Sequence, residues 1–152
     1  MPTESLVQLD TNLDDLDPRL IPRAIDQLLA AGALDAWTMP ILMKKGRPAF
    51  LLSALVANEP DAIARVRDTM FRETTTLGIR ESTVVRHSLD RRMTQVDVDG
   101  HEVAVKVASL TNGDVVNVSV EWDDVERIAD ATGRAAADIL AEADAAARAA
   151  VI

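Results

Sequence analysis

The sequence predicts an α+β fold in two parts: a ferredoxin-like split β-α-β lobe over residues 1–89, followed by a smaller α+β lobe over residues 90–152. Three observations support this prediction. Apolar residues in the first part recur in the order β-α-β-β-α-β. In the second part, an Asp-Gly pair between two alternating segments indicates a hairpin. Two helical segments separated by Thr132-Gly133 then end the chain.

The first lobe begins with a short apolar strand, residues 6–9, followed by a polar turn that runs from Asp10 to Asp17. Asp17 is suited to cap a helix whose first residue is Pro18, and Gly32 ends that helix. The other predicted elements are strands 36–43, 49–56 and 79–87, and a helix starting near Pro60 with Ile63, Val66 and Met70 facing inward.

The second lobe begins with strands 93–98 and 102–108, joined by Asp99-Gly100. Residues 115–120 alternate again and predict a third strand. Helices are expected over residues 123–131 and 135–149, the second of them rich in alanine.

Composition excludes several classes of function. A net charge of −9 argues against bulk nucleic-acid binding, and an aromatic content of 3% argues against stacking on single strands. No apolar stretch is long enough to span a membrane, and the N-terminus lacks the order of a secretion signal. With no cysteine there is neither a disulfide framework nor a thiolate metal site. We therefore expect a soluble, cytoplasmic protein that binds neither nucleic acid nor membrane.

The most informative segment is 71–80, in which three successive threonines stand between two arginines, just where a helix should stop and a strand should start. Gly78 in this loop is free to take an unusual backbone angle. Hydroxyls, amides and guanidinium groups in one turn are suited to phosphate. The alternative is that the threonines only cap the helix and begin the strand. The predicted phosphate ligands of this segment are Arg72, Thr74, Thr75 and Arg80.

The predicted turn before the first helix carries Asn12, Asp14 and Asp15. Clustered oxygen ligands attract a hard divalent cation, which can bridge to phosphate. Alternatively, the carboxylates only complement the positive end of the helix dipole.

The densest basic point is the turn with Lys44, Lys45 and Arg47. It could clamp a phosphorylated ligand, or its lysines could serve solubility at a hairpin tip. Arg80 and Arg86 have the same parity on one strand, so both are predicted to face one side and to contact the ligand. The two histidines have no second ligand at metal spacing. The sequence contains no recognisable catalytic triad or Gly-rich phosphate loop, so it identifies no catalytic residue.

Four ordered motifs together resemble the nickel insertase of the nickel-pincer nucleotide cofactor, which lactate racemase uses. The similarity runs from Leu6 to Gly133, and the motifs are residues 9–15, 31–35, 40–48 and 71–80.

The resemblance implies CTP-dependent insertion of nickel into pyridinium-3,5-bisthiocarboxylic acid mononucleotide by a cyclometallase, a metal chelatase of the lyase class. CTP would bind with Mg²⁺ or Mn²⁺ and be cleaved to CMP and pyrophosphate, while Ni²⁺ is the substrate metal. The resemblance covers the C-terminal, CTP-binding part of the usual family member. The N-terminal domain, with its histidine-rich segment, is then expected as a partner, and the chain is either an excised domain or a separate subunit.

A homo-oligomer, with trimer and hexamer as the expected forms, is also consistent with the exposed sheet edges. The rival hypothesis is a non-catalytic oligomeric module that binds a nucleotide or serves assembly without turnover.

Overall fold

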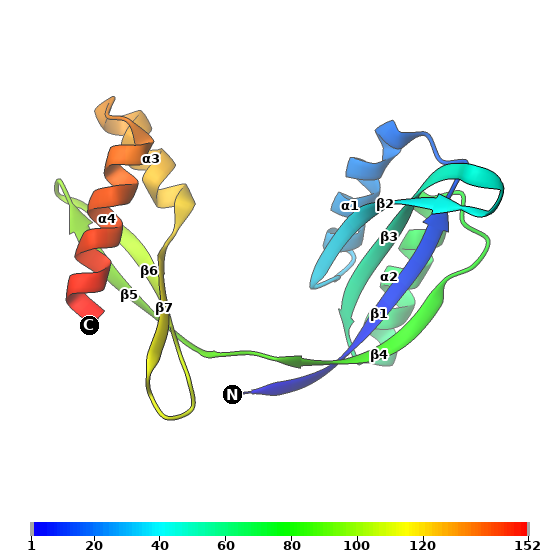
Figure 1. Cartoon of the computed structure of the whole chain (residues 1–152), viewed down its shortest axis with the longest axis horizontal. Coiled ribbons are helices and arrows are strands. Elements are labelled where there is room, and N and C mark those ends of the chain that lie inside the picture. Colours follow the sequence, from blue (N-terminus) through cyan, green and yellow to red (C-terminus); the bar gives the residue numbers. More distant parts are fainter. Residues whose placement is uncertain (1, 152) are drawn as a thin grey trace. The chain divides into compact units, whose positions relative to one another are not determined.

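The computed structural model describes residues 2–151, which divide into two compact units (Figure 1). The N-terminal unit is Thr3–Arg86, and the C-terminal unit is formed by the described chain from His87 onward together with Pro2. Each unit pairs an antiparallel sheet with helices, which confirms the predicted α+β class. In the described part of the chain, no helix combines the length and the apolar character needed to cross a bilayer.

The N-terminal unit has a four-stranded sheet in the order β2-β3-β1-β4, which is the ferredoxin-like order predicted from the sequence. β3 pairs antiparallel with both β1 and β2. The elements are β1 (Thr3–Leu13), α1 (Ile21–Ala30), β2 (Asp35–Met43), β3 (Arg47–Ala57), α2 (Pro60–Glu73) and β4 (Arg80–His87).

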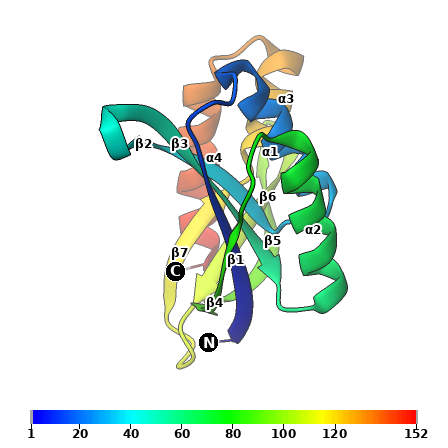
Figure 2. The ribbon, with the colours of Figure 1, turned by 90° about the vertical axis from the view of Figure 1, so that its right-hand side faces the viewer.

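Both helices of this unit lie on the same face of its sheet (Figures 1 and 2). Alternate residues of β1, among them Leu9 and Leu13, point to that face and are buried. The helices contribute Leu28 from α1 and Val66 and Met70 from α2 to the same core. Their spacing of three and four residues is what places them on one side of each helix.

β1 is longer than predicted, because it continues to Leu13 instead of turning at Asp10. Its pairing with β3 runs unbroken from Leu6 opposite Ala57 to Leu13 opposite Phe50. The polar residues at even positions of β1 face away from the helices, so they mark the outer face of a strand and not a turn. The predicted turn therefore shrinks to the few residues before Pro18.

The turns largely follow their predicted chemistry. Asp17 caps a 3-10 turn, Pro18–Leu20, by accepting a hydrogen bond from the backbone N–H of Arg19 at 3.0 Å. The basic turn Lys44–Gly46 is a 3-10 turn in which Lys45 has a φ of 64°. Gly78, by contrast, does not adopt a positive φ, although a glycine is free to do so.

The C-terminal unit has a three-stranded antiparallel sheet in the order β5-β6-β7, covered by two helices (Figure 1). Asp99 and Gly100 both have positive φ, as the two-residue turn of the predicted hairpin requires. The elements are β5 (Asp90–Val98), β6 (His101–Ser109), β7 (Val115–Val120), α3 (Trp122–Thr132) and α4 (Ala136–Val151).

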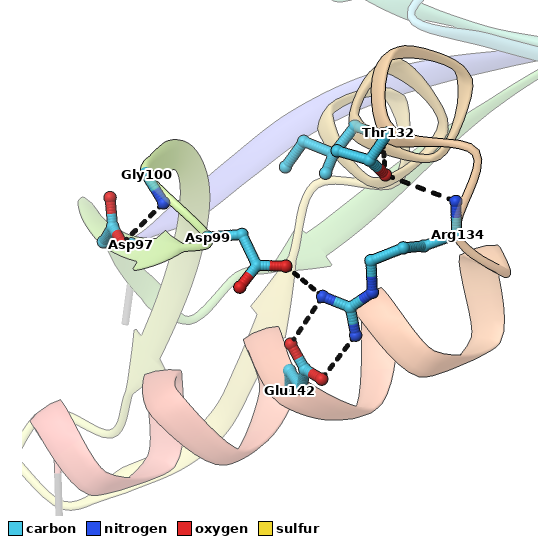
Figure 3. A network of polar contacts seen from close by, with 7 residues as sticks. Asp97, Asp99, Gly100, Thr132, Arg134 and Glu142 are labelled. Carbon is cyan, nitrogen blue, oxygen red and sulfur yellow. Dashed lines mark hydrogen bonds and ion pairs between the residues drawn. The ribbon is translucent and has the colours of Figure 1, made fainter.

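Arg134 connects the hairpin of this unit to its helices (Figure 3). Its guanidinium group donates to Asp99 at the hairpin tip and to both carboxylate oxygens of Glu142 on α4, at 2.5 and 3.1 Å. The hydrogen bonds to Glu142, and then those to Asp99, raise the pKa of Arg134 above its ordinary value. The network thus holds the β5–β6 turn against the connection between α3 and α4.

Candidate phosphate- and metal-binding site

Three segments of the N-terminal unit meet at one end of its sheet: the end of β1, the turn between β2 and β3, and the loop that joins α2 to β4. We call this region the polar end. It is formed by Asn12, Asp14, Asp15, Arg47, Thr75 and Arg80.

The predicted metal ligands and the predicted phosphate ligands of the polar end contact each other in pairs. Arg47 Nη1 lies 3.0 Å from Asp14 Oδ2. The Thr75 hydroxyl donates to Asp15 Oδ1 at 2.5 Å. The third pair joins Arg80 Nη2 to Asn12 Oδ1 at 2.8 Å. Residues from sequence positions more than thirty apart are thereby brought into one cluster.

The Arg47–Asp14 pair is partly open to solvent, with 59% of the Arg47 side chain and 28% of the Asp14 side chain exposed. An exposed pair of this kind is weak, because water screens its charges. A ligand of matching charge can therefore exchange with it at small cost.

The threonines divide between the two roles that the sequence left open. Thr74 donates to the carbonyl of Met70 at 2.7 Å and so serves the end of α2. Thr75 binds the Asp15 carboxylate. The Thr76 hydroxyl lies 2.5 Å from that of Thr11, and both are within 3.0 Å of the Gly78 carbonyl.

Thr11 and Asp10 are two contributors that the sequence reasoning missed. Thr11 is only 1% exposed and fixes the loop after α2 to β1. Asp10 lies on the same face of β1 as Asn12 and accepts hydrogen bonds from Gln8 and from the buried Ser53 hydroxyl, the latter at 2.6 Å. The period of two along β1 was the signal that could have identified both.

The remaining candidates lie outside these pairs. Within residues 2–151, the side chains of Lys44 and Lys45 make no hydrogen bond or ion pair, although they are next to Arg47 in the chain. Arg72 lines a hollow on the outer face of α2. Arg86 pairs with Glu4 at 2.9 Å, six residues along β4 from Arg80, which corresponds to roughly 20 Å.

A hollow of about 320 Å³ adjoins the polar end. Among the described residues that line it, Asp14 alone is charged and the others are apolar. This size is at the lower end of small-ligand pockets. The other lining residues are Leu13, Leu16, Pro18, Pro40, Ile41, Pro48, Ala49 and Phe50.

The donor set of the polar end fits a hard divalent cation only if a ligand completes it. Among the described residues, no three His, Cys, Asp or Glu side chains gather closely enough to hold a metal. Asp14 and Asp15 offer two carboxylates, and Asn12 adds an amide oxygen. Mg²⁺ and Mn²⁺ accept such oxygen ligands and take their remaining ligands from water or phosphate.

The structure is similar to LarC2, the C-terminal domain of a cyclometallase involved in the synthesis of the NPN cofactor of lactate racemase, with a TM-score of 0.85 and 29% identity over 96% of this chain and 98% of that one. A protein from Methanopyrus kandleri AV19 gives a TM-score of 0.64 at 30% identity over 97% of this chain and 89% of that one. The family model described as "Nickel insertion protein" matches residues 1–140. The chain belongs to the nickel insertion protein family.

Curated members of the nickel insertion protein family are similar along most of this chain. The pyridinium-3,5-bisthiocarboxylic acid mononucleotide nickel insertion protein of Nocardioides sp. is 53% identical over 141 residues, which are 93% of this chain and 35% of that protein. A putative nickel insertion protein of Myxococcus xanthus is 41% identical over 94% of this chain and 36% of its own length. The chain thus spans about a third of the length of these nickel insertion proteins.

Proposed function

We propose that this chain is the C-terminal, nucleotide-binding part of a CTP-dependent nickel insertase that places Ni²⁺ in pyridinium-3,5-bisthiocarboxylic acid mononucleotide. The observation that carries the proposal is the meeting of carboxylates and guanidinium groups at the polar end, beside an apolar hollow, in a chain of this family. Nickel is the substrate metal, and a separate Mg²⁺ or Mn²⁺ accompanies CTP.

The paired side chains at the polar end explain how a metal-bound triphosphate is accepted. Phosphate oxygens replace Asp14 as the partner of Arg47, with bidentate geometry available to the guanidinium group. Lys44 and Lys45 add charge from the same turn. Asp14 and Asp15 are then free to bind a cation. A divalent ion at this place would neutralise the triphosphate and stabilise the charge that develops on the leaving pyrophosphate.

The apolar hollow beside Asp14 provides a place for the cytosine ring. Burial of a flat ring against Pro40, Pro48 and Phe50 removes apolar surface from water. The phosphates then extend toward Arg47, because Asp14 lines the hollow and its carboxylate lies 3.0 Å from Arg47 Nη1.

Calorimetric titration with CTP and Mn²⁺ tests the site. Arg47→Ala is expected to weaken CTP binding about tenfold, since it removes a charge-assisted contact at a partly exposed position. Lys45→Ala is expected to act in the same direction by a smaller factor. Arg67→Ala on α2 removes the same charge away from the polar end, and it should leave the affinity unchanged. Equal affinities in all three variants would refute the assignment.

Turnover separates the insertase from the rival binding module. With CTP, Mn²⁺ and the pyridinium mononucleotide present, the insertase releases pyrophosphate, whereas the module binds CTP stoichiometrically without release. We propose a homo-oligomer and an N-terminal insertase domain as partners, so the assay is run with and without that domain from a relative. A thermal-shift screen of four nucleoside triphosphates with Mn²⁺ should favour CTP, because selective binding stabilises the folded chain.

A further inference from the structure

The outer face of α2 carries a feature that the nucleotide site does not use. It is hollowed by about 520 Å³ and points away from the core, because α2 buries Ile63, Val66 and Met70 on its other side. The hollow is lined by one face of α2 and by a single residue at the C-terminal end of α1. It consists of Ala31, Asp61, Ala64, Arg65, Asp68, Thr69 and Arg72.

The charged members of this face form a straight stripe of alternating sign. Asp61, Arg65, Asp68 and Arg72 follow one another at spacings of four, three and four residues and are all exposed. These spacings average about 3.7 residues, close to the 3.6 residues of one helical turn, so the four side chains stay on one side of α2. We call these four residues the α2 stripe.

Opposite charges along the α2 stripe do not pair with one another. In the described structure, the side chains of Arg65, Arg72 and Asp61 make no hydrogen bond or ion pair. The nearest cation to Asp68 is Arg67, at 3.9 Å and outside the stripe. Oppositely charged side chains three or four residues apart usually form ion pairs with each other and so stabilise their own helix. Here the four charges remain available to a partner.

The order of charges along the α2 stripe is complementary to the same order in an antiparallel helix. Inverting the helix about the point between Val66 and Arg67 places Asp61 on Arg72, and it places Arg65 on Asp68. The same inversion exchanges the two smaller lining residues, Ala64 and Thr69. We propose that a second copy of this chain docks here, with the two α2 helices antiparallel across a two-fold axis and every aspartate of the stripe facing an arginine of the other copy.

Small side chains beside the α2 stripe suit this arrangement. Ala64 and Thr69 flank the stripe, one on each side, and both are small and half-buried, so two helices can approach to the usual 8–10 Å. A helix of 14 residues is only about 21 Å long, however, so the contact is smaller than a standard interface. The resulting dimer is therefore weak and sensitive to salt, because its charged pairs are near the surface.

A phosphate ligand held by Arg65 and Arg72 is the competing explanation for the same hollow. Asp61 and Asp68 line the hollow as well and repel an anion, whereas a second copy satisfies all four charges. Self-association therefore gives all four charges of the α2 stripe an opposite charge, whereas phosphate binding does so only for the two arginines.

Charge reversal tests the proposal in sedimentation velocity over a range of protein and salt concentrations. Arg65→Asp places aspartates opposite each other across the axis, and Asp68→Arg does the same with arginines, so each variant alone should lose the two-fold contact. The double variant Arg65→Asp/Asp68→Arg restores opposite charges and should associate like the natural chain. A mixture of the two single variants should form a heterodimer, because each then faces its opposite.

Cysteine crosslinking tests the register of the two α2 helices. The natural chain has no cysteine, so only the introduced cysteines can form disulfides. In the double variant Asp61→Cys/Arg72→Cys, mild oxidation should join position 61 of one copy to position 72 of the other, as peptide mapping would show. The proposal is overturned if the natural chain is monomeric at every concentration, or if the single reversals associate as it does. Tight binding of inorganic phosphate that Arg65→Asp abolishes, without any change in mass, would also overturn it.

Discussion

At the scale of single residues, the polar end is assembled before any ligand arrives. Arg47, Thr75 and Arg80 are each hydrogen-bonded to one of the proposed metal ligands. In the proposed complex they would exchange these partners for phosphate oxygens of the metal-bound triphosphate. Because these side chains are already ordered, less conformational entropy is lost when the ligand binds. The buried Thr11 contributes by fixing the loop that carries Thr75.

Asp124 provides a second example, in the C-terminal unit. Its carboxylate accepts hydrogen bonds from Arg127 Nη2 at 2.7 Å and from the backbone N–H of Ala104 at 2.9 Å. The bond from Arg127, followed by that from Ala104, lowers the pKa of Asp124 below the ordinary value of 3.8. The start of α3 is thereby held to the middle of β6.

This pKa predicts how stability changes with acid. The unfolded chain binds the proton more tightly than the folded one, so the contribution of Asp124 is fully present above pH 3.8 and is lost as the pH falls through the lowered folded pKa. Asp124→Asn should therefore be less stable than the natural protein at neutral pH, and the difference should shrink below about pH 4.

Urea unfolding at several pH values measures this difference. The matched control is Asp123→Asn, which removes the same charge from the same first turn of α3. The Asp123 side chain is exposed and makes no hydrogen bond or ion pair within residues 2–151. A difference for Asp124→Asn that stays constant with pH would contradict the prediction.

At the scale of elements, most boundaries follow from apolar spacing and from a few glycines. Gly133 ends α3 in the left-handed region, with a φ of 71°, and its N–H donates to the Ala129 carbonyl at 2.8 Å. Gly78 precedes β4 without a positive φ. An added Cβ would meet no atom within 4 Å at either position, so backbone conformation alone distinguishes the two.

Alanine substitution at these glycines should have opposite effects. Gly133→Ala should lower the free energy of unfolding by roughly 1 kcal/mol, because an L-residue is strained at that φ. Gly78→Ala should be neutral or stabilise by up to about 1 kcal/mol, since alanine restricts the unfolded chain without strain. Thermal unfolding of both variants makes the comparison, and equal losses of stability would contradict it.

At the scale of the whole molecule, each unit has a core of its own. The largest cluster of buried residues, which includes Leu9 and Leu52, lies within the N-terminal unit. The clusters around Ile128 and around Val105 both lie within the C-terminal unit. Removal of packing in one unit should therefore destabilise that unit alone.

Hydrogen exchange of two core variants tests this independence. Ile128→Ala should cost about 2–5 kcal/mol by leaving a cavity, and should reduce amide protection in β5, β6 and β7 but not in β1 and β3. Leu52→Ala is the reciprocal control and should reduce protection in the N-terminal unit only. Loss of protection in both units from either variant would show that the cores are coupled.

Much of the fold could be predicted because its signals are local. The apolar spacing of α2, the Asp99-Gly100 turn and the caps at Asp17 and Gly133 each depend on a few neighbouring residues. The extent of β1 could not be predicted in this way, because polar residues from Asp10 onward are as typical of a turn as of the outer face of a strand. Only the pairing of β1 with β3 shows that they belong to the strand.

The sequence by itself determined the fold class, the order of the elements and the residue types available to a phosphate and a cation. Only the tertiary structure decided which of them meet: Arg47 with Asp14, Thr75 with Asp15, and Arg80 with Asn12, while Arg86 lies at the far end of β4. The physical reason is that backbone preference acts between neighbours in the chain, whereas these contacts join segments that only the pairing of distant strands brings together.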